Sequence, residues 1–367
     1  VRRFRFDPQD ARLKPFVLLG LAVALGFIVG VLSREPSVVF ADGNAYLYLL
    51  YLLPILCVDW SRERQRELLQ LLAAGVAWVS LLSFALLYVF SHFGEGILRP
   101  TYVFFRDLRV AEITALGGGV SRVFIQSQVF VVIFGFLLFV YGAQGRTSRV
   151  IIMLQAVAWG VLLLSLSRSF WIGLVPAVAV MLFLLVLRTH KTVRVLLTEA
   201  PARAASVVLG AGLIVAVVLF PIPSQRINSF DLAQSLKDRA LEDQDAGIVS
   251  RWKLLRPMLG KIFESPLIGS GFGGSVTFQT DDPRVRAIHP DGTWTTYSME
   301  WGWLELWLKM GIVGPAAFLY AAYEILRRLL TRAQGQDGWL AIGLIGGLAF
   351  LYATHFFSPY LNHPIGL

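Results

Sequence analysis

Residues Leu68–Phe90 read LLQLLAAGVAWVSLLSFALLYVF, an apolar stretch without a charged residue. Its length is that of a helix crossing a bilayer, which needs about 20 residues. Comparable runs occupy Pro15–Leu32, Phe170–Leu187 and Ser206–Phe220. None of them alternates apolar with polar residues, as a half-buried strand would. Because only helices and closed barrels satisfy the backbone in hydrocarbon, these runs predict transmembrane helices.

The composition of the whole chain also predicts a membrane protein. Of its 367 residues, 56% are hydrophobic and only 16% are charged, and the mean hydropathy is +0.64. A soluble domain has no way to hide so much apolar surface. The single cysteine, Cys57, excludes an intrachain disulfide and a cysteine-based zinc site. Its apolar surroundings predict a small core residue.

We therefore predict an all-α fold, a polytopic transmembrane helical bundle that forms a single transmembrane domain over residues 1–367. The first apolar run lacks the small-residue cleavage site of a signal peptide, so it is predicted to be a retained span. About nine spans are visible, at residues 15–32, 44–59, 68–90, 121–142, 150–166, 169–187, 206–222, 301–326 and 337–357.

Basic residues in the short loops predict the orientation of these spans. With the N-terminus in the cytoplasm, one phase of the alternation puts the basic clusters inside, and the short outer loop around Glu35 carries only Arg34. The net charge of +9 is thereby explained without nucleic acid, and no nucleic-acid partner is predicted. The cytoplasmic clusters comprise Arg2, Arg3, Arg5, Arg12, Lys14, Arg62, Arg64, Arg66, Arg146, Arg149, Arg188, Lys191, Arg194, Arg203, Arg327, Arg328 and Arg332.

Two long segments, residues 92–120 and 223–299, fall outside the membrane in this topology. Because loops of this length in a compact domain are usually functional, we expect the site in these segments, and the larger one is predicted to be partly helical. Between Ile248 and Phe263 its apolar residues recur at three- and four-residue spacing, which predicts an amphipathic helix in the membrane interface. The glycine-rich stretch Gly269–Gly274 follows. Without a preceding strand it favours a tight turn over a phosphate-binding loop.

Two arginines are candidates for binding phosphate. Arg168 lies between two apolar runs with almost no loop, and a basic residue within a span is a functional hypothesis by default. Arg251 lies on or beside the apolar stripe of the loop helix, next to Trp252. Contact with lipid phosphate would explain either one alone, but two planar forks that match phosphate favour a diphosphate clamp. Other arginines of the loop, such as Arg256, are predicted to be solvated.

Two side chains are candidates for a general base on the outer side. Glu300 opens the predicted span after the large loop, where a carboxylate can accept a proton, although the helix macrodipole alone also favours glutamate there. His289 is the other candidate. The adjacent Asp281 and Asp282 lack the further ligands that a metal needs. Neither a metal site nor a cofactor is therefore predicted.

Three segments together resemble the bacterial O-antigen ligase and polysaccharide polymerase superfamily. Leu166–Gly173 (LSRSFWIG) is similar to the Ser-Arg-Ser/Gly motif that the family carries between two spans. Ser250–Trp252 (SRW) and Glu264–Gly273 (ESPLIGSGFG) are similar to its arginine-tryptophan helix and Pro-Leu-x-Gly-x-Gly turn. Trp303–Gly314 (WLELWLKMGIVG) is similar to the span after its large loop. The resemblance covers about residues 150–367, and the first four spans match only in general character.

This resemblance implies a GT-C-like, metal-independent glycosyltransferase of the bacterial inner membrane whose active site faces the periplasm. The implied donor is a glycan on undecaprenyl diphosphate, the acceptor is a saccharide or lipid A-core, and membrane lipids surround the protein. In the family, arginines that match Arg168 and Arg251 are thought to hold the diphosphate. That agrees with the clamp predicted from the chemistry of the two residues.

One departure from the family bears on the type of enzyme. Ligases carry a His-Asn pair eleven and ten residues before the glycine that matches Gly311, and here Glu300 and Trp301 stand at those positions. The ligase base is therefore missing from its place. This difference favours a polymerase, with Glu300 or His289 as the base.

Other interpretations stay open at this point. Trp294, Tyr297 and Trp301 are candidate sugar contacts, but an interfacial aromatic belt explains them equally well. The alternatives to a polymerase are a ligase that transfers glycan to lipid A-core and, in another class, a transporter that moves lipid-linked glycan without bond chemistry. The outer clustering of the candidate arginines and the lack of a convincing inverted repeat in the sequence speak against the transporter.

Overall fold

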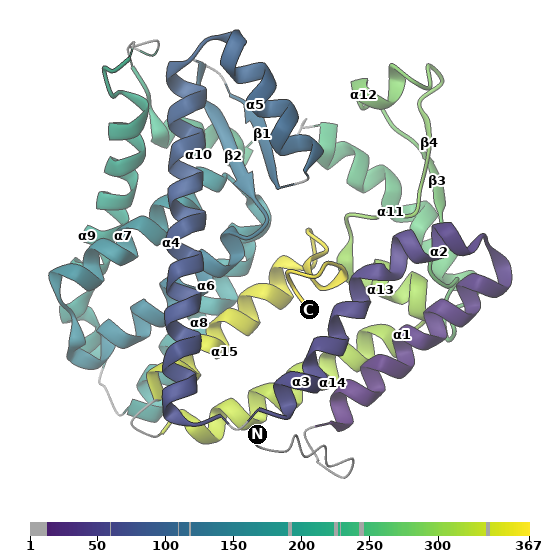
Figure 1. The fold of residues 1–367 in the computed structure, drawn as a ribbon, viewed down its shortest axis with the longest axis horizontal. Helices are drawn as coiled ribbons and strands as arrows, with labels where there is room; N and C mark the ends of the chain where they lie inside the picture. Colours follow the sequence, from purple (N-terminus) through teal and green to yellow (C-terminus); the bar gives the residue numbers. More distant parts are fainter. Residues whose placement is uncertain are drawn as a thin grey trace. The chain divides into compact units, whose positions relative to one another are not determined.

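Helices make up most of the chain, and two small antiparallel sheets accompany them (Figure 1). The computed structural model describes residues 13–58, 60–108, 110–116, 119–189, 193–223, 227, 229–241, 246–334 and 338–367. Five basic residues used for the predicted orientation, Arg2, Arg3, Arg5, Arg12 and Lys191, lie outside the described residues. The all-α, polytopic fold predicted from the hydropathy pattern is confirmed.

Six segments of the described chain are long and apolar enough to cross a membrane, judged by length and composition. They make this a multi-pass membrane protein. The segments are α1 (Lys14–Ser33); Pro36–Leu56, which joins α2 (Pro36–Gly43), η1 (Asn44–Tyr51) and α3 (Leu52–Leu56); α4 (Arg62–His92); Gln128–Arg146, which joins α6 (Gln128–Tyr141) and η3 (Gly142–Arg146); Arg168–Arg188 of α8 (Arg168–Thr189); and Thr198–Val218 of α9 (Val193–Val218). Two shorter apolar helices, α7 (Arg149–Ser165) and α15 (Gly338–Thr354), lie where two further spans were predicted.

Two of the predicted spans are built differently. The predicted span 121–142 begins with a strand, β2 (Ser121–Ile125), and its helix starts only at Gln128. The sequence did not reveal the strand, because periodicity does not distinguish a short apolar strand from a helical segment. The predicted span 301–326 is broken at Gly311 into α13 (Gly302–Met310) and α14 (Val313–Arg332). Gly311 has φ +64°, and a Cβ there would lie 2.0 Å from the carbonyl oxygen of Leu267, so the chain turns sharply where it passes the loop.

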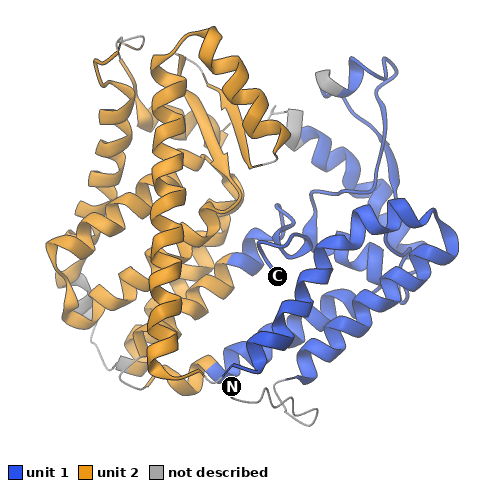
Figure 2. Ribbon diagram, in the orientation of Figure 1, with its two compact units in different colours: residues 1–59, 242–328, 351–367 blue, residues 60–241, 329–350 orange. Residues whose placement is uncertain are grey.

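The chain divides into two compact units, which Figure 2 colours blue and orange. Unit 1 comprises Val1–Asp59, Glu242–Arg328 and Leu351–Leu367, and unit 2 comprises Trp60–Leu241 and Leu329–Phe350. The organisation as one transmembrane domain over residues 1–367, with 223–299 as its large outer loop, stays a prediction.

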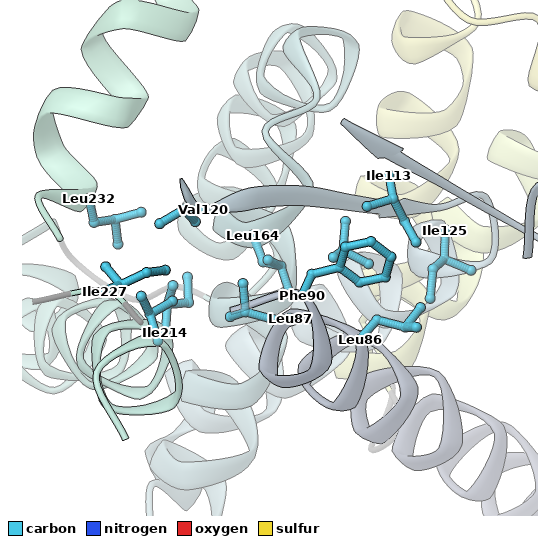
Figure 3. Packing of buried hydrophobic residues seen from close by; sticks show 12 residues of the cluster. Leu86, Leu87, Phe90, Ile113, Val120, Ile125, Leu164, Ile214, Ile227 and Leu232 are labelled. Carbon is cyan, nitrogen blue, oxygen red and sulfur yellow. The ribbon is translucent and has the colours of Figure 1, made fainter. Parts of the chain in front are cut away.

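The core of unit 2 joins the ends of helices to a β-hairpin (Figure 3). Strand β1 (Ala111–Ala115) pairs antiparallel with β2, and Ile113 and Ile125 pack against Leu86 and Phe90 of α4. The helix α5 (Glu95–Asp107) precedes the hairpin. Leu232, the first residue of α10 (Leu232–Leu241), also belongs to this hydrophobic cluster. The predicted outer segment 92–120 is thus folded as a helix and a strand.

Unit 1 contains most of the predicted large loop, which is partly helical as expected. Its main helix, α11 (Ala246–Glu264), contains the predicted stretch from Ile248 to Phe263 and continues through Pro257. Leu254, Met258 and Ile262 form its buried face, whereas Trp252 is 59% exposed. The helix is therefore amphipathic, but Trp252 and Phe263, two apolar residues of the predicted stretch, are exposed. The strands β3 (Val276–Gln279) and β4 (Thr293–Thr296), with the short α12 (Pro283–Arg286) between them, pack beside it.

The glycine-rich stretch Gly269–Gly274 forms the tight turn that the sequence favours. Gly271 has φ +75°, and a Cβ on it would lie 2.3 Å from the backbone nitrogen of Gly30 in α1. The amide of Ser270 donates to the carbonyl of Leu308 at 2.7 Å, and the amide of Phe272 donates to the carbonyl of Gly26 at 2.9 Å. Close packing of backbone, rather than phosphate binding, explains these glycines.

Candidate functional site

An ion pair joins Arg251 and Glu300, two residues that the sequence separates by the whole hairpin. Arg251 projects from the first half of α11, and its Nε donates to the Glu300 carboxylate, which lies two residues before α13 begins. The side chains are 32% and 50% exposed. The arginine expected to bind diphosphate and the carboxylate expected to act as base are therefore direct partners.

This ion pair lies at the wall of a pocket within unit 1. Ser250, Arg251 and Leu254 of α11 line this pocket. Ser250 and Leu254 are four residues apart and therefore share one face of the helix, and Arg251 lies beside that face. Phe278 and Trp294 are directly opposed across the hairpin, and their face of the strands points into the pocket. The full lining is Ser250, Arg251, Leu254, Phe278, Asp282, Val285, Ile288, Trp294, Thr296, Ser298 and Glu300.

The lining combines five apolar or aromatic residues with six polar or charged ones. Pockets of this composition bind small molecules, because the apolar walls remove water and the polar groups fix the orientation. The flat face of an aromatic ring packs on the C–H face of a sugar, and hydroxyl and carboxylate groups bond to sugar hydroxyls. Trp294 and Phe278 supply the first kind of surface here, while Ser250, Thr296 and Glu300 supply the second.

The hairpin is fastened to α11 on the side of Asp281. Lys253 of α11 and Arg286 of α12 both form ion pairs with this carboxylate. The hydrogen bond and charge of Lys253, followed by the charge of Arg286, hold the pKa of Asp281 below its ordinary value. Asp281 thus serves a structural ion pair, and among the described residues no group of three or more His, Cys, Asp or Glu side chains is placed to hold a metal ion.

Trp301 supports the backbone of α11 at Arg251 through a hydrogen bond. Its ring is only 7% exposed and packs between Trp252, at 5.3 Å between ring centroids, and Phe357, at 5.4 Å. The indole Nε1 donates to the backbone carbonyl of Arg251 at 2.9 Å. This candidate sugar contact is a buried support of the site in the structure, and a direct role with sugar stays a prediction.

The two other candidates in the hairpin region, His289 and Tyr297, are not among the residues that line the pocket. His289 is exposed and its ring lies 5.9 Å from that of Trp294, which lines the pocket, whereas His289 itself does not. Tyr297 is 39% exposed. Its carbonyl accepts a hydrogen bond from Lys309 at 2.6 Å. Glu300 is therefore the candidate base that lies in the pocket wall, and His289 is one side chain removed from it.

Arg168 lies in unit 2, at the turn between α7 and α8. Leu166 ends α7 with φ +44° and ψ +33°, a left-handed conformation that is strained for a branched residue. The hydroxyl oxygens of Ser167 and Ser169 lie 2.9 Å apart, and both side chains are buried. The turn aims Arg168 at α10, where its Nε donates to the carbonyl of Arg239 at 2.7 Å.

A third arginine, which sequence reasoning missed, supports this turn. Arg122 of β2 is 9% exposed, and its Nε donates to the carbonyl of Ser165 at 2.7 Å, at the end of α7. A basic side chain there satisfies one of the carbonyls that a helix leaves open at its C-terminus. The signal was present in the sequence, because Arg122 falls inside a predicted span, where a basic residue is costly.

The comparisons with known proteins give one match. The family described as O-Antigen ligase matches residues 152–319, from α7 through the hairpin to the first part of α14. That segment contains Arg168, Arg251 and Glu300. No curated protein and no solved structure matches the chain.

Proposed function

We infer that this chain, whose residues 152–319 match the O-antigen ligase family, is a membrane protein of the O-antigen ligase and polymerase superfamily. Proteins of that family are glycosyltransferase-like enzymes. We propose that this one elongates a glycan carried on undecaprenyl diphosphate at the periplasmic face of the inner membrane. The observation that supports the proposal most is the Arg251–Glu300 ion pair in the wall of a pocket with aromatic and hydroxyl groups.

The proposed reaction forms one glycosidic bond and breaks one bond to phosphate. An acceptor sugar hydroxyl attacks the anomeric carbon of the donor, and the carbon–oxygen bond to the diphosphate breaks with both electrons going to the leaving oxygen. Undecaprenyl diphosphate departs as an anion, so it needs no proton. Glu300 takes the proton of the attacking hydroxyl.

The two arginines would supply the largest part of the catalysis. Negative charge grows on the leaving diphosphate, and fixed cationic donors stabilise such charge better than water does. Arg251 would bind the diphosphate beside the pocket, and Arg168 would provide a second fork. A base beside the acceptor hydroxyl adds typically about 10²–10⁴-fold.

The ion pair links the two halves of this reaction. A guanidinium that binds diphosphate can no longer hold a carboxylate in the same place, so the donor must displace Glu300 from Arg251. An ion pair this exposed contributes only about 0–1 kcal/mol, and a diphosphate with two negative charges competes with it easily. Glu300 is thereby released as a base when the donor is bound.

The nature of the acceptor separates a polymerase from a ligase. We favour a polymerase because glutamate stands where ligases carry histidine. The pocket wall of Trp294, Thr296 and Ser298 would receive the saccharide of a growing chain.

Reconstituted protein supplied with lipid-linked repeat units tests the proposal. We expect a ladder of longer lipid-linked chains, lost in Arg251→Ala and kept in Arg256→Ala, since Arg256 lies on the same helix outside the pocket. Glycan found only on added lipid A-core would identify a ligase instead. Relocation across the membrane without any change in glycan length would identify a transporter and refute the enzyme.

A further inference from the structure

Unit 1 contains a cluster of three buried ionisable side chains that the proposed reaction does not use. Lys309 of α13 forms an ion pair with Asp42 of α2, and its Nζ lies 3.9 Å from the carboxylate of Glu305, one helical turn back. The side chains of Lys309, Asp42 and Glu305 are 1%, 8% and 7% exposed. Burying an ion costs several kcal/mol even in a soluble protein, so charges in an apolar bundle indicate a function.

Each member of this cluster is held by hydrogen bonds as well as by charge. The Nδ2 of Asn362 donates to Glu305 at 2.7 Å, and Tyr46 donates to the same amide at 3.1 Å. The backbone amide of Gly273 donates to Asp42 at 2.5 Å. Such bonds repay part of the cost of desolvation and fix the geometry of the cluster.

Lys309 connects this cluster to the candidate site. Besides Asp42, its ammonium group bonds to the carbonyl of Tyr297, at 2.6 Å. Tyr297 is three residues before Glu300, and its neighbours Thr296 and Ser298 line the pocket. A shift of the ammonium group therefore moves the segment between β4 and α13, which contains Glu300.

Asp42 connects the cluster to the other side of the site. The amide of Gly273 is part of the turn that leads out of α11, the helix of Arg251. Arg34, at the end of α1, holds the same turn through the carbonyl of Ser270 at 2.5 Å. Residues of α1, α2 and α13 thus all bond to this one turn, since Leu308 of α13 accepts from the amide of Ser270. Asp42 lies outside the segment 152–319 that matches the family.

We propose that Asp42 and Lys309 are positioning residues for the candidate site, resting on the proposed function. Their ion pair links two segments, because Asp42 bonds to Gly273 in the turn after α11 and Lys309 bonds to Tyr297 in the segment between β4 and α13. It thereby sets the separation of the Arg251 guanidinium and the Glu300 carboxylate. The N-terminal segment α1–α2 then contributes to the geometry of the site through Asp42.

Replacing the ion pair by apolar side chains tests this role. A buried pair exchanged for hydrophobic residues of similar volume often leaves stability unchanged, so Asp42→Leu/Lys309→Met should fold and insert. Because misplacement by about 1 Å costs about 10²-fold in rate, we expect kcat to fall by about that factor with the donor KM unchanged. A matched control, Glu324→Leu/Arg327→Met, removes another ion pair of unit 1 and should keep the wild-type kcat. A folded double variant of Asp42 and Lys309 with wild-type kcat would overturn the proposal.

A second measurement does not depend on activity. In a Cys57→Ser background, the rate of disulfide formation between Arg251→Cys and Glu300→Cys reports how well the two positions are held together. We expect this rate to fall when the Asp42–Lys309 pair is replaced by Leu and Met, and an unchanged rate would contradict the positioning role. If the wild-type protein transfers no glycan, the proposed function fails, and the disulfide rate alone judges the positioning role.

A charge-conserving variant decides the case in which the apolar pair does not fold. Lys309→Arg keeps the ion pair with Asp42, but its larger head pushes on the carbonyl of Tyr297. We expect a lower kcat with an unchanged donor KM. An unchanged kcat in the folded Lys309→Arg protein would show that the placement of this carbonyl does not matter, and would overturn the proposal.

Discussion

The turn around Arg168 in unit 2 and the pocket wall around Arg251 in unit 1 hold the same type of side chain in different ways. Arg168 donates to a backbone carbonyl from a turn that contains a left-handed Leu166 and buried serines. Arg251 donates to the carboxylate of Glu300, in a half-exposed ion pair. The bond of the Arg168 Nε depends on backbone geometry, and the bond of the Arg251 Nε depends on a charge that another anion can replace.

This difference assigns different roles to the two arginines. A neutral carbonyl oxygen does not compete with phosphate for the charge of the guanidinium, so the bond from the Nε of Arg168 to the Arg239 carbonyl can remain when substrate binds. A carboxylate competes directly with phosphate, so Arg251 must exchange one anion for another. We therefore propose that Arg168 is a preorganised donor, and that Arg251 couples donor binding to the release of Glu300.

The largest expected effect comes from removing either guanidinium. Loss of one preorganised donor costs about 10²–10³-fold in kcat. Because an arginine supplies several donors and a full charge, Arg168→Ala and Arg251→Ala should reduce turnover to background in protein that is folded and inserted. Quantitative gels of lipid-linked products measure this.

Lysine at the same positions sharpens the comparison. A point charge cannot reproduce the planar fork, so both lysine variants should be poorly active. Arg251→Lys keeps an ion pair with Glu300 and should retain more activity than Arg168→Lys, which loses the bond to the Arg239 carbonyl. Full activity in Arg168→Lys would reduce that residue to a surface charge.

An intermediate effect is expected from Glu300→Gln. The change keeps the shape but removes the proton acceptor, so kcat should fall by about 10²–10⁴-fold. It also frees Arg251 from a competing charge. An exposed ion pair contributes about 0–1 kcal/mol, so donor binding should tighten by up to about fivefold. Single-turnover rates and donor titration measure the two effects separately.

His289→Ala is the matched comparison for this variant. Because His289 does not line the pocket, we expect the chemical step in His289→Ala to proceed at near the wild-type rate. A normal rate in Glu300→Gln together with an inactive His289→Ala would transfer the role of base to His289. Normal rates in both would show that neither side chain is the base.

Much of this arrangement could be predicted from the sequence, because its signals are local. Apolar runs and their lengths predicted the helical membrane fold, and an arginine between two runs marked Arg168. The amphipathic period from Ile248 to Phe263 predicted α11, which runs from Ala246 to Glu264. The break of the span at Gly311 was missed, since it depends on the close approach of the Leu267 carbonyl, which is a contact between distant residues.

Other parts depend on tertiary structure and could not be predicted. Nothing in the spacing of Arg251 and Glu300 shows that the hairpin returns the chain to α11. The left-handed conformation of Leu166 has no sequence signature, because leucine disfavours it. Lys309 is different: a basic residue inside a predicted span is a visible signal, and its partner Asp42 interrupts another apolar segment.

The smallest expected effect comes from the support behind Arg251. Trp301→Phe keeps an aromatic ring between Trp252 and Phe357 but removes the indole N–H that bonds to the Arg251 carbonyl. Loss of one such bond costs about 0.5–1.5 kcal/mol, which equals about a two- to twelvefold change if all of it appears in turnover. If Trp301 acts only through Arg251, the variant should lower kcat within that range and leave the KM for the acceptor saccharide unchanged. A direct sugar contact predicts the opposite pattern, a raised acceptor KM at an unchanged kcat. Steady-state kinetics with varied acceptor therefore separate a buried support from a binding surface.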